Sequence, residues 1–366
     1  DSAVDRIFCA GANIYMLGKS THAFKVNFCK FTNETRMGIE DLSRNSGVTS
    51  IAALNGTAAG GGYELALACD QIYLVDDGNS AVSFPEVPLL AVLPGTGGLT
   101  RLVDKRKIRR DRADIFCTVA EGVKGKRAKK WGLVDDVFSR STWDDKIAER
   151  AQAAVDAGAG DPGWSGVTLD PVTPEVTEDA LRFEHVRVEL DHGARTANLV
   201  VSGPPPDAPI DPDGMLAEGP DFWALKAFRE LDRALLHLRV DLPGINVVTV
   251  RTEGDITSAL RLDAALWEHR DHGFVREVQL HISRTLRRMD LTAKSFFALI
   301  EPGSCFAGSL LELALASDRQ YMLEDDDDTN AIALSRLNGG ACPMSHGPTR
   351  LDIRFLADPE VAAGLL

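Results

Sequence analysis

An internal repeat limits the folds open to this chain more than any other feature of its sequence. The heptapeptide Glu-Leu-Ala-Leu-Ala-Cys-Asp at residues 64–70 returns as Glu-Leu-Ala-Leu-Ala-Ser-Asp at residues 312–318. Farther along, Thr-Arg-Leu at residues 100–102 returns at residues 349–351, at nearly the same separation. Identities at so many spaced positions are typical of two copies of one structural unit. We therefore expect two tandem units.

Short apolar runs, small-residue turns and helical segments alternate through the first copy. Residues 48–54 and 71–75 have the composition and length of strands. Residues 144–157 show the apolar periodicity of an amphipathic helix. This alternation favours an α/β fold of stacked βα units over an all-α or an all-β domain.

A stretch rich in Gly, Pro, Asp and Thr at residues 158–180 is predicted to be a linker. It separates a first domain at residues 1–157 from a second at residues 181–366. Early in the second domain we expect two paired strands, an amphipathic helix and a buried strand, at residues 183–190, 197–201, 222–238 and 245–251.

The two copies differ in extent. Fewer residues precede Glu64 than separate residue 181 from Glu312. If the copies are alike, roughly 70 residues are missing from the start of the first copy. The second copy stops soon after Glu312, whereas the first continues to about residue 157. The sequence thus predicts a chain that is cut at both ends.

Composition excludes several classes of partner. Of the 366 residues, 44% are hydrophobic and 26% are charged, as in soluble globular proteins. The formal net charge of −14 argues against a nucleic-acid partner. No run of about 18 apolar residues exists, so we expect no membrane span. The six cysteines lack Cys-x-x-Cys spacing, which argues against a metal site or disulfides and favours a reducing, cytoplasmic compartment.

A basic run at residues 105–112 allows two interpretations. It fits a solvated helix face, and it also fits a patch for the anionic tail of a cofactor. The sequence leaves both open.

Three consecutive glycines, residues 60–62, stand before a helical pattern whose first acidic residue is Glu64. Glycine permits unusual backbone conformations and close approach of a ligand. The first N–H groups of a helix lack internal partners, so they stabilise an oxygen that gains negative charge. Ordinary strand-to-helix turns show the same pattern, so the glycines alone do not decide between structure and function.

Other residues point to the same chemistry. Ala12 follows the strand-to-turn element Phe-Cys-Ala-Gly, and its N–H together with that of Gly61 suits an oxyanion hole. Glu86 follows Glu64 after 22 residues. Two carboxylates beside one polarised carbonyl suit acid and base catalysis with water. Each glutamate alone is equally well explained as a surface residue, but the set in this order favours a site.

This set resembles the crotonase (enoyl-CoA hydratase/isomerase) superfamily. The matching segments include Phe-Cys-Ala-Gly-Ala-Asn and the glycine-rich stretch, and they lie at residues 8–13, 55–70, 85–102 and 130–135. The resemblance implies a crotonase-like ββα-superhelix (spiral) in two tandem copies and an acyl-CoA thioester substrate. It implies no cofactor, because the CoA belongs to the substrate. It also implies an oxyanion hole of the Ala12 and Gly61 N–H groups, with Glu64 and Glu86 as the catalytic residues.

Further residues fall at positions that the resemblance assigns to the substrate. Ala10, Asn13, Gly60 and Gly95 are expected to contact the acyl-CoA, although Asn13 stands where the family usually has Asp. Cys29 is a further candidate for the catalytic pocket, but simple packing of a buried thiol explains it as well.

The second copy keeps Glu312 and lacks the rest of the set. Ser309 stands where the first copy has Gly61, and the equivalent of Glu86 falls near Ser335. We therefore expect a degenerate unit with a structural or dimer-forming role, and a homodimer or other homo-oligomer.

A fused pair of this kind resembles superfamily lyases that open the ring of an epoxidised benzoyl-CoA with water. This narrower resemblance implies a carbon–carbon lyase of aromatic catabolism that releases formate. Two alternatives stay open. An ordinary enoyl-CoA hydratase or isomerase leaves the second unit unexplained, and a non-catalytic assembly module leaves the catalytic set unexplained.

Overall fold

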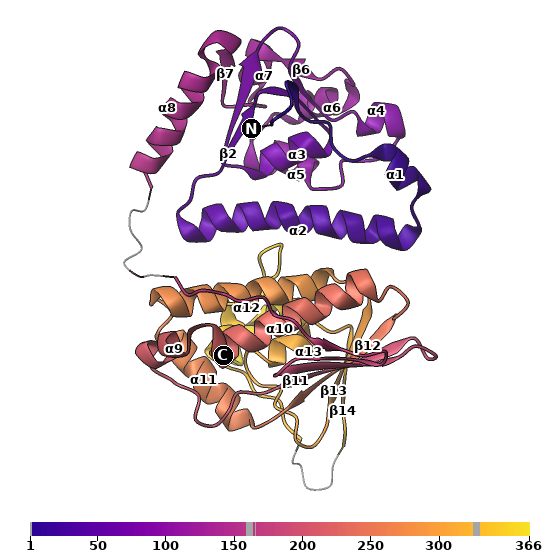
Figure 1. Ribbon diagram of the computed structural model, residues 1–366, viewed down its shortest axis with the longest axis vertical. Coiled ribbons are helices and arrows are strands. Elements are labelled where there is room, and N and C mark those ends of the chain that lie inside the picture. Colours follow the sequence, from indigo (N-terminus) through magenta and orange to yellow (C-terminus); the bar gives the residue numbers. More distant parts are fainter. Residues whose placement is uncertain (1, 159–163, 165, 325–329) are drawn as a thin grey trace. The chain divides into compact units, whose positions relative to one another are not determined.

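The chain forms two compact units, Asp1–Gly160 and Asp161–Leu366 (Figure 1). The structure is a computed structural model that describes residues 2–158, 164, 166–324 and 330–366. The division between the units falls within residues 158–180, the predicted linker, of which residues 159–163 and 165 lie outside the described residues.

The first unit contains two small, mainly parallel sheets. One has the order β1 (Arg6–Cys9), β3 (Gly56–Ala59), β5 (Ala81–Ser83) and β6 (Val123–Lys124). The other has the order β2 (Ile51–Leu54), β4 (Gln71–Asp76) and β7 (Asp136–Ser139). Because β2 and β3 are consecutive in the chain, the backbone passes from one sheet to the other within two residues.

Helices follow the strands of the first unit. They are α1 (Ile14–Lys19), α2 (His22–Ser46), α3 (Gly61–Ala68), α4 (Glu86–Leu90), α5 (Gly98–Thr100), the π-helical turn η1 (Arg101–Lys105), α6 (Arg110–Thr118), α7 (Gly125–Trp131), the short turn η2 (Arg140–Thr142) and α8 (Trp143–Asp156). Three fully buried rings, Tyr63, Phe84 and Phe116, pack with centroids 5.3–5.7 Å apart and anchor α3 and α6 in one core. This core fixes the start of α3.

Most predicted elements of the first unit are present, and one was missed. The predicted strands at residues 48–54 and 71–75 are β2 and β4, and the predicted helix at residues 144–157 is α8. Residues 56–59 form a further strand, β3, which the local sequence does not predict. The reason is non-local, since β3 pairs in parallel with β1 from far earlier in the chain.

The second unit is built on one sheet. Its order is β14 (Arg319–Met322), β13 (Ser295–Ile300), β12 (Val247–Glu253), β11 (Thr196–Ser202), β10 (Val186–Asp191), β9 (Ala180–Arg182) and β8 (Glu175–Val176). Strands β11 to β14 are parallel, and β8 to β11 form an antiparallel meander. The predicted strand pair at residues 183–190 and 197–201 is confirmed as β10 and β11.

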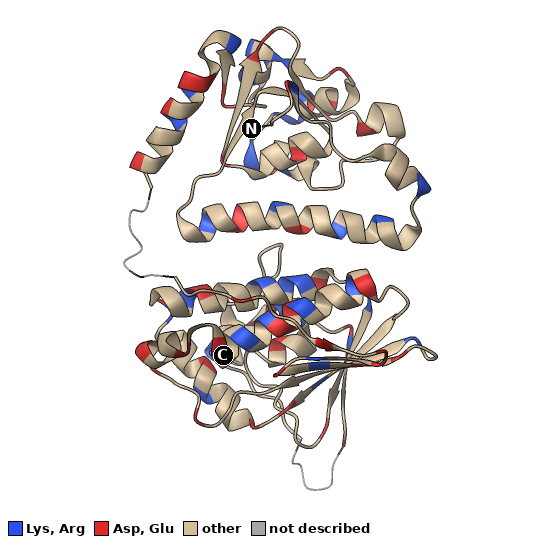
Figure 2. Ribbon diagram, viewed as in Figure 1, with Lys and Arg blue, Asp and Glu red and all other residues tan. Residues whose placement is uncertain are grey.

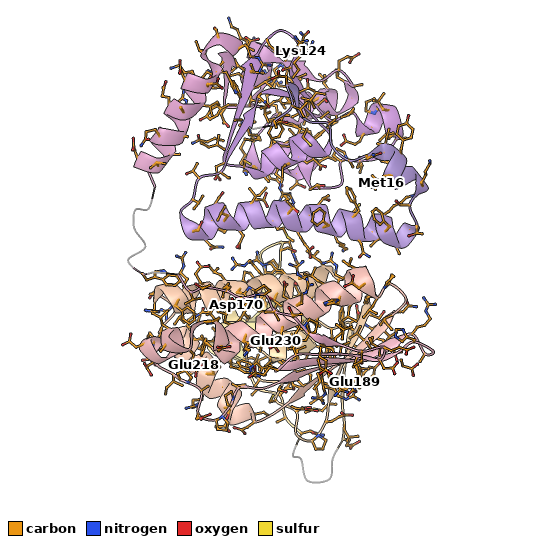
Figure 3. All side chains as sticks on the ribbon, viewed as in Figure 1. Met16, Lys124, Asp170, Glu189, Glu218 and Glu230 are labelled. Carbon is orange, nitrogen blue, oxygen red and sulfur yellow. The ribbon has the colours of Figure 1, made fainter. Side chains whose placement is uncertain are left out.

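Helices cover this sheet. They are α9 (Pro212–Glu218), the short turn η3 (Gly219–Asp221), α10 (Trp223–Leu236), the π-helical turn η4 (His237–Asp241), α11 (Ile256–Glu268), α12 (Gly273–Leu291), α13 (Leu311–Leu315), the short turn η5 (Arg336–Gly339), α14 (Arg350–Arg354) and α15 (Pro359–Gly364). The apolar faces of α10 and α12 pack on the core, as the periodicity of residues 222–238 predicts for α10. Glu230, labelled in Figure 3, lies in this buried face and accepts the N–H groups of His185 and Val186 at 2.7 and 3.1 Å.

The predicted linker is too long at its C-terminal end. Residues 175–176 are β8, and Val176 pairs with Leu181 in the sheet of the second unit. Trp164 and Val167 also pack against the core of that unit, and the ring of Trp164 lies 6.4 Å from that of Phe274. Apolar contacts therefore order a segment whose composition is that of a loop.

Acidic and basic residues are interspersed along α2 (Figure 2), so this helix carries both signs of charge. No helix among the described residues is long and apolar enough to cross a membrane. All six cysteines are free thiols.

The basic run at residues 105–112 has structural partners at its start. The ammonium of Lys105 donates to the carbonyls of Ala68 and Cys69 at 2.7 and 2.9 Å, at the C-terminal end of α3. Arg106 pairs with Asp135 at 2.9 Å. These contacts support neither a free helix face nor an anion patch for the two residues.

Candidate active site

The turn between β3 and α3 is the centre of the site, and it requires glycine. Gly60 has a φ of +54°, and its N–H donates to a β5 carbonyl at 2.9 Å. A Cβ at Gly60 would lie 2.5 Å from Oε1 of Glu86, and a Cβ at Gly62 would lie 2.2 Å from the carbonyl oxygen of Cys9. The glycines thus allow both the turn and the close approach of its neighbours.

The loop after β1 reaches the same turn. Because β1 pairs with β3, with Cys9 opposite Ala58, the residues after Cys9 lie beside the start of α3. A Cβ at Gly11 would lie 3.0 Å from the nitrogen of Gly61, and a Cβ at Gly61 would lie 3.9 Å from the nitrogen of Ala12. The structure therefore brings together the two N–H groups that the sequence pairs in an oxyanion hole.

Glu64 lies one turn into α3 and is almost fully buried, with 3% of its surface exposed. Its Oε1 accepts the backbone N–H groups of Thr96 and Gly98 at 2.8 and 2.9 Å. Burial raises the pKa of Glu64, and these hydrogen bonds, which favour the carboxylate, oppose that rise. The loop at residues 95–98 therefore holds this carboxyl group in a fixed orientation.

Glu86 is the first residue of α4 and lies on the other side of the Gly60 turn. Its Oε2 is buried and has no hydrogen-bond partner among the described residues. Burial raises the pKa of Glu86, and the charge of Glu64 raises it further. Two neighbouring carboxyl groups with raised pKa values, one tightly held and one with a buried oxygen that has no partner among the described residues, suit general acid and base catalysis.

The other predicted residues surround this centre more loosely. Asn13 is the N-cap of α1, and its side chain accepts the N–H of Met16, labelled in Figure 3, at 3.1 Å, as expected for a capping residue. Ala10 and Gly95 are exposed loop residues. Cys29 is exposed on α2 and is therefore not a buried packing residue. Its place in a pocket stays a prediction.

Sequence reasoning missed two neighbours of the glutamates. Cys117 on α6 lies near Glu86, and burial, Asp114 and Glu86 together raise the pKa of its thiol to about 11. Arg36 on α2 lies near enough to Glu64 to interact with its charge, and burial lowers the pKa of this arginine despite the opposing effects of Glu40 and Glu64. Neither residue lies in a motif, so only the fold places them here.

Apolar side chains lie beside the glutamates. Leu89 and Leu90 on α4, and Val92 and Leu93 after it, are 45–68% exposed. Ile14 and Tyr15 on α1 are also exposed, and α1 lies on the same side of the unit as α4 (Figure 1). An exposed apolar rim beside buried acids suits a substrate with a large apolar group.

Comparison with known proteins identifies the first unit. Residues 1–159 match the model of the enoyl-CoA hydratase/isomerase family. These residues form a domain of this family. The resemblance inferred from the motifs around Gly61 and Glu64 is therefore confirmed.

Relatives of the enoyl-CoA hydratase/isomerase domain differ in how much of the chain they match. Benzoyl-CoA-dihydrodiol lyase of Aromatoleum evansii is 51% identical over 364 residues, which are 100% of this chain and 66% of that protein. The fatty acid oxidation complex subunit alpha of Shewanella loihica is 38% identical over 135 residues, 37% of this chain and 18% of that protein. An enoyl-CoA hydratase structure from Bacillus anthracis is 30% identical, with a TM-score of 0.37, over 42% of this chain and 56% of that one.

Proposed function

We propose that this chain cleaves the ring of a 2,3-epoxybenzoyl-CoA, or its dihydrodiol, with water. The convergence of Ala12, Gly61, Glu64 and Glu86 at one turn carries the proposal. Identity to benzoyl-CoA-dihydrodiol lyase along all of this chain supports the aromatic acyl group. The chain spans 66% of that relative's length, so the activity of the whole protein is part of the proposal.

The proposed chemistry follows from the site. The thioester oxygen lies between the Ala12 and Gly61 N–H groups, which stabilise negative charge on it. The ring conjugated to this carbonyl then accepts electrons as carbon–carbon bonds break. Glu64 and Glu86 activate water and move protons, and which of them is the acid stays open. The epoxide and two waters give 3,4-didehydroadipyl-CoA semialdehyde and formic acid, released as formate, and no cofactor besides the CoA of the substrate takes part.

A parallel assay tests this proposal. The purified protein is given 2,3-epoxybenzoyl-CoA and crotonyl-CoA at equal concentrations, and formate and hydrated product are measured. We expect formate from the epoxide and slow or no hydration of crotonyl-CoA. Fast hydration without formate would favour an ordinary enoyl-CoA hydratase, and no turnover of either thioester would favour an assembly module.

We also propose that the second unit is a diverged tandem copy of the first. The side chain of Asp70 accepts the N–H of Ser50 at 2.8 Å, and the side chain of Asp318 accepts the N–H of Phe296 at the same distance. Each pair joins a residue at the start of β13, or just before β2, to an aspartate that follows α13 or α3. These equal contacts follow the sequence repeat and support a common origin of the two folds.

The second unit keeps the backbone turn of the first unit, but a side chain of the protein occupies the position equivalent to the proposed oxyanion hole. Gly308 has a φ of +52°, close to that of Gly60. The N–H of Gly60 donates to the carbonyl of Ser83 and that of Gly308 to the carbonyl of Ala333, both at 2.9 Å. The next N–H, that of Ser309 in place of Gly61, donates to the carboxylate of Asp263 at 2.7 Å. In the proposed site of the first unit this N–H faces substrate. A carboxylate of the protein thus occupies the equivalent place in the second unit, which supports a structural role.

Because Asp263 is buried, we expect its ionisation to make the protein less stable as the pH rises. Asp263 is fully buried, and burial raises its pKa to about 6. The unfolded chain therefore loses this proton at lower pH than the folded chain, so the stability contributed by the neutral acid is present below about pH 4 and is lost as pH rises to about 6. We expect the loss to be about 3 kcal/mol and to be absent in Asp263→Asn.

Urea unfolding at pH 4.5 and pH 7 measures this effect. The difference between the two pH values should change by about 2 kcal/mol between wild type and Asp263→Asn, because part of the loss has already occurred at pH 4.5. Asp255, the exposed N-cap of α11, is the matched control, because its pKa is lowered and its replacement by Asn should change the difference in the opposite direction. An unchanged difference in Asp263→Asn would contradict the prediction.

We further propose a cytoplasmic location and assembly as a homo-oligomer. The six free thiols support a reducing compartment. The assembly rests on the family resemblance, and light scattering of the purified protein tests it.

A further inference from the structure

The loop at residues 95–98, which binds Glu64, is itself held in place by Arg101. Thr96 and Gly98 supply the two N–H groups, and Gly97 between them has a φ of +86°. The carbonyl oxygen of Gly97 accepts a hydrogen bond from Nη1 of Arg101 at 3.2 Å. The same carbonyl also accepts the backbone N–H of Arg101 at 3.1 Å. Arg101 therefore holds the turn that orients both N–H groups through its guanidinium as well as through its backbone.

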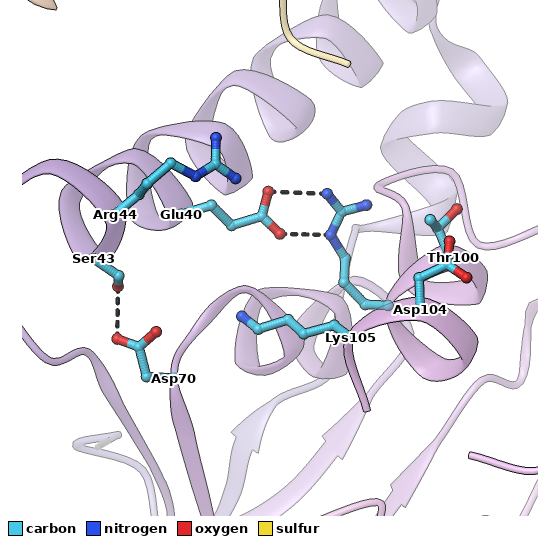
Figure 4. Close-up of a pocket in the computed structure, with 8 residues that line it drawn as sticks. Glu40, Ser43, Arg44, Asp70, Thr100, Asp104 and Lys105 are labelled. Carbon is cyan, nitrogen blue, oxygen red and sulfur yellow. Dashed lines mark hydrogen bonds and ion pairs between the residues drawn. The ribbon is translucent and has the colours of Figure 1, made fainter. Parts of the chain in front are cut away.

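Arg101 is fixed by a carboxylate on another element. Its Nε and Nη2 donate to the two oxygens of Glu40 on α2 at 2.6 and 2.9 Å, which is a bidentate pair (Figure 4). Arg36, one turn earlier on α2, donates to the same carboxylate at 2.6 Å. The three side chains are only 11–17% exposed, although a cavity of about 470 Å³ opens beside Glu40 and Arg101. A buried bidentate pair holds its geometry better than an exposed one.

The second unit shows the alternative arrangement. Arg350, the repeat equivalent of Arg101, makes the same bidentate contact with Asp290 at 3.0 and 2.6 Å. It also donates directly to Glu312, the equivalent of Glu64, at 2.9 Å. A direct ion pair holds Glu312 as a charged partner, whereas neutral N–H groups hold Glu64. In the first unit, by contrast, Arg101 contacts the Gly97 turn, and the N–H groups on either side of that turn contact Glu64.

We propose that Arg101, clamped by Glu40, is a positioning residue that fixes the Gly97 turn so that the Thr96 and Gly98 N–H groups point at Glu64. This inference rests on the proposed function, in which Glu64 is one of the two catalytic carboxyls. Arg101 acts through the loop and does not touch the reacting atoms. Its fork geometry matters more than its charge, because the bidentate contact fixes the turn.

Arg101→Lys tests this inference, because lysine keeps the charge and loses the fork. The titration of Glu64 is followed by ¹³C NMR of glutamate-labelled protein, with Glu64→Gln assigning the signal. Loosened hydrogen bonds stabilise the carboxylate less, so we expect the pKa of Glu64 to rise by about one pH unit. We also expect kcat to fall about tenfold with KM within about threefold, because the turn orients an acid or base rather than the substrate.

Two further variants make the test specific. Arg106→Lys is the matched control, because Arg106 pairs with Asp135 and does not contact the Gly97 turn, so Glu64 should titrate as in wild type. Glu40→Gln, which leaves Arg101 in place, should move the Glu64 titration in the same direction as Arg101→Lys. An unmoved Glu64 titration in folded Arg101→Lys and Glu40→Gln would overturn the inference. A moved titration in a protein that turns over neither thioester would support the inference and refute the proposed function.

Discussion

Replacing Glu64 with glutamine is expected to lower kcat by about 10²- to 10⁴-fold, the usual effect of removing a general acid or base. The amide is nearly the same size as the carboxyl group, and its oxygen can still accept the N–H groups of Thr96 and Gly98. The loop and the fold should therefore stay intact, and only proton transfer is lost. Steady-state kinetics with 2,3-epoxybenzoyl-CoA measures kcat, and calorimetry with benzoyl-CoA measures binding, which should stay within about threefold.

A variant of the second carboxyl group, Glu86, and a control variant complete this experiment. Glu86→Gln should lower kcat over the same range, because both carboxyls serve the proposed reaction. Glu121 is exposed, so Glu121→Gln should change kcat less than about twofold. Wild-type kcat in Glu64→Gln with normal binding would contradict the assignment of Glu64.

Replacing Arg350 with methionine is expected to have the largest effect on stability. Arg350 is 2% exposed and joins Glu312 and Asp290, which are 1% and 8% exposed. Removing the cation leaves two carboxylates buried near each other without compensation, which costs about 3–5 kcal/mol. Urea denaturation measures the loss, and a variant within about 1 kcal/mol of wild type would contradict the prediction.

An exposed pair in the same unit is the control. Arg187 on β10 pairs with Glu253 on β12, with β11 between the two strands, and the two side chains are 37% and 53% exposed. Arg187→Met should destabilise the protein by about 1 kcal/mol or less, because water and ions screen this pair. The contrast separates the effect of burial from that of losing an arginine.

Local sequence patterns predicted the helices and strands whose own residues show a clear periodicity. The periodicity of residues 144–157 predicted α8. By contrast, Gly-Thr-Ala-Ala at residues 56–59 has little strand character and forms β3 only because β1 lies beside it. Residues 175–176, in a segment whose composition is that of a loop, form β8 because β9 pairs with them. Pairing between distant segments is not written in local composition.

The residues of the candidate site also fall into those that motifs predict and those that only the fold brings into place. Gly61, Glu64 and Glu86 could be proposed because each stands in a motif with a chemical reason for its spacing. Arg101 lies in a motif too, but its contact with Glu40 crosses from one helix to another and follows from packing alone. Asp263 lies in no motif, and its contact with the N–H of Ser309 joins α11 to a turn far along the chain and follows from packing alone. Contacts of this kind become visible only in the structure.

The central claim is that the Ala12 and Gly61 N–H groups polarise a thioester carbonyl, and infrared spectroscopy of that carbonyl tests it most directly. Benzoyl-CoA labelled with ¹³C at the carbonyl is bound to wild type, to Gly61→Ala, which keeps the N–H, and to Gly61→Pro, which removes it. Gly61 is the first residue of α3, a position where helices accept proline. The account predicts a carbonyl stretch at lower wavenumber than in water for wild type and Gly61→Ala, and a smaller shift for Gly61→Pro. The same stretch in water and in the wild-type complex would contradict it.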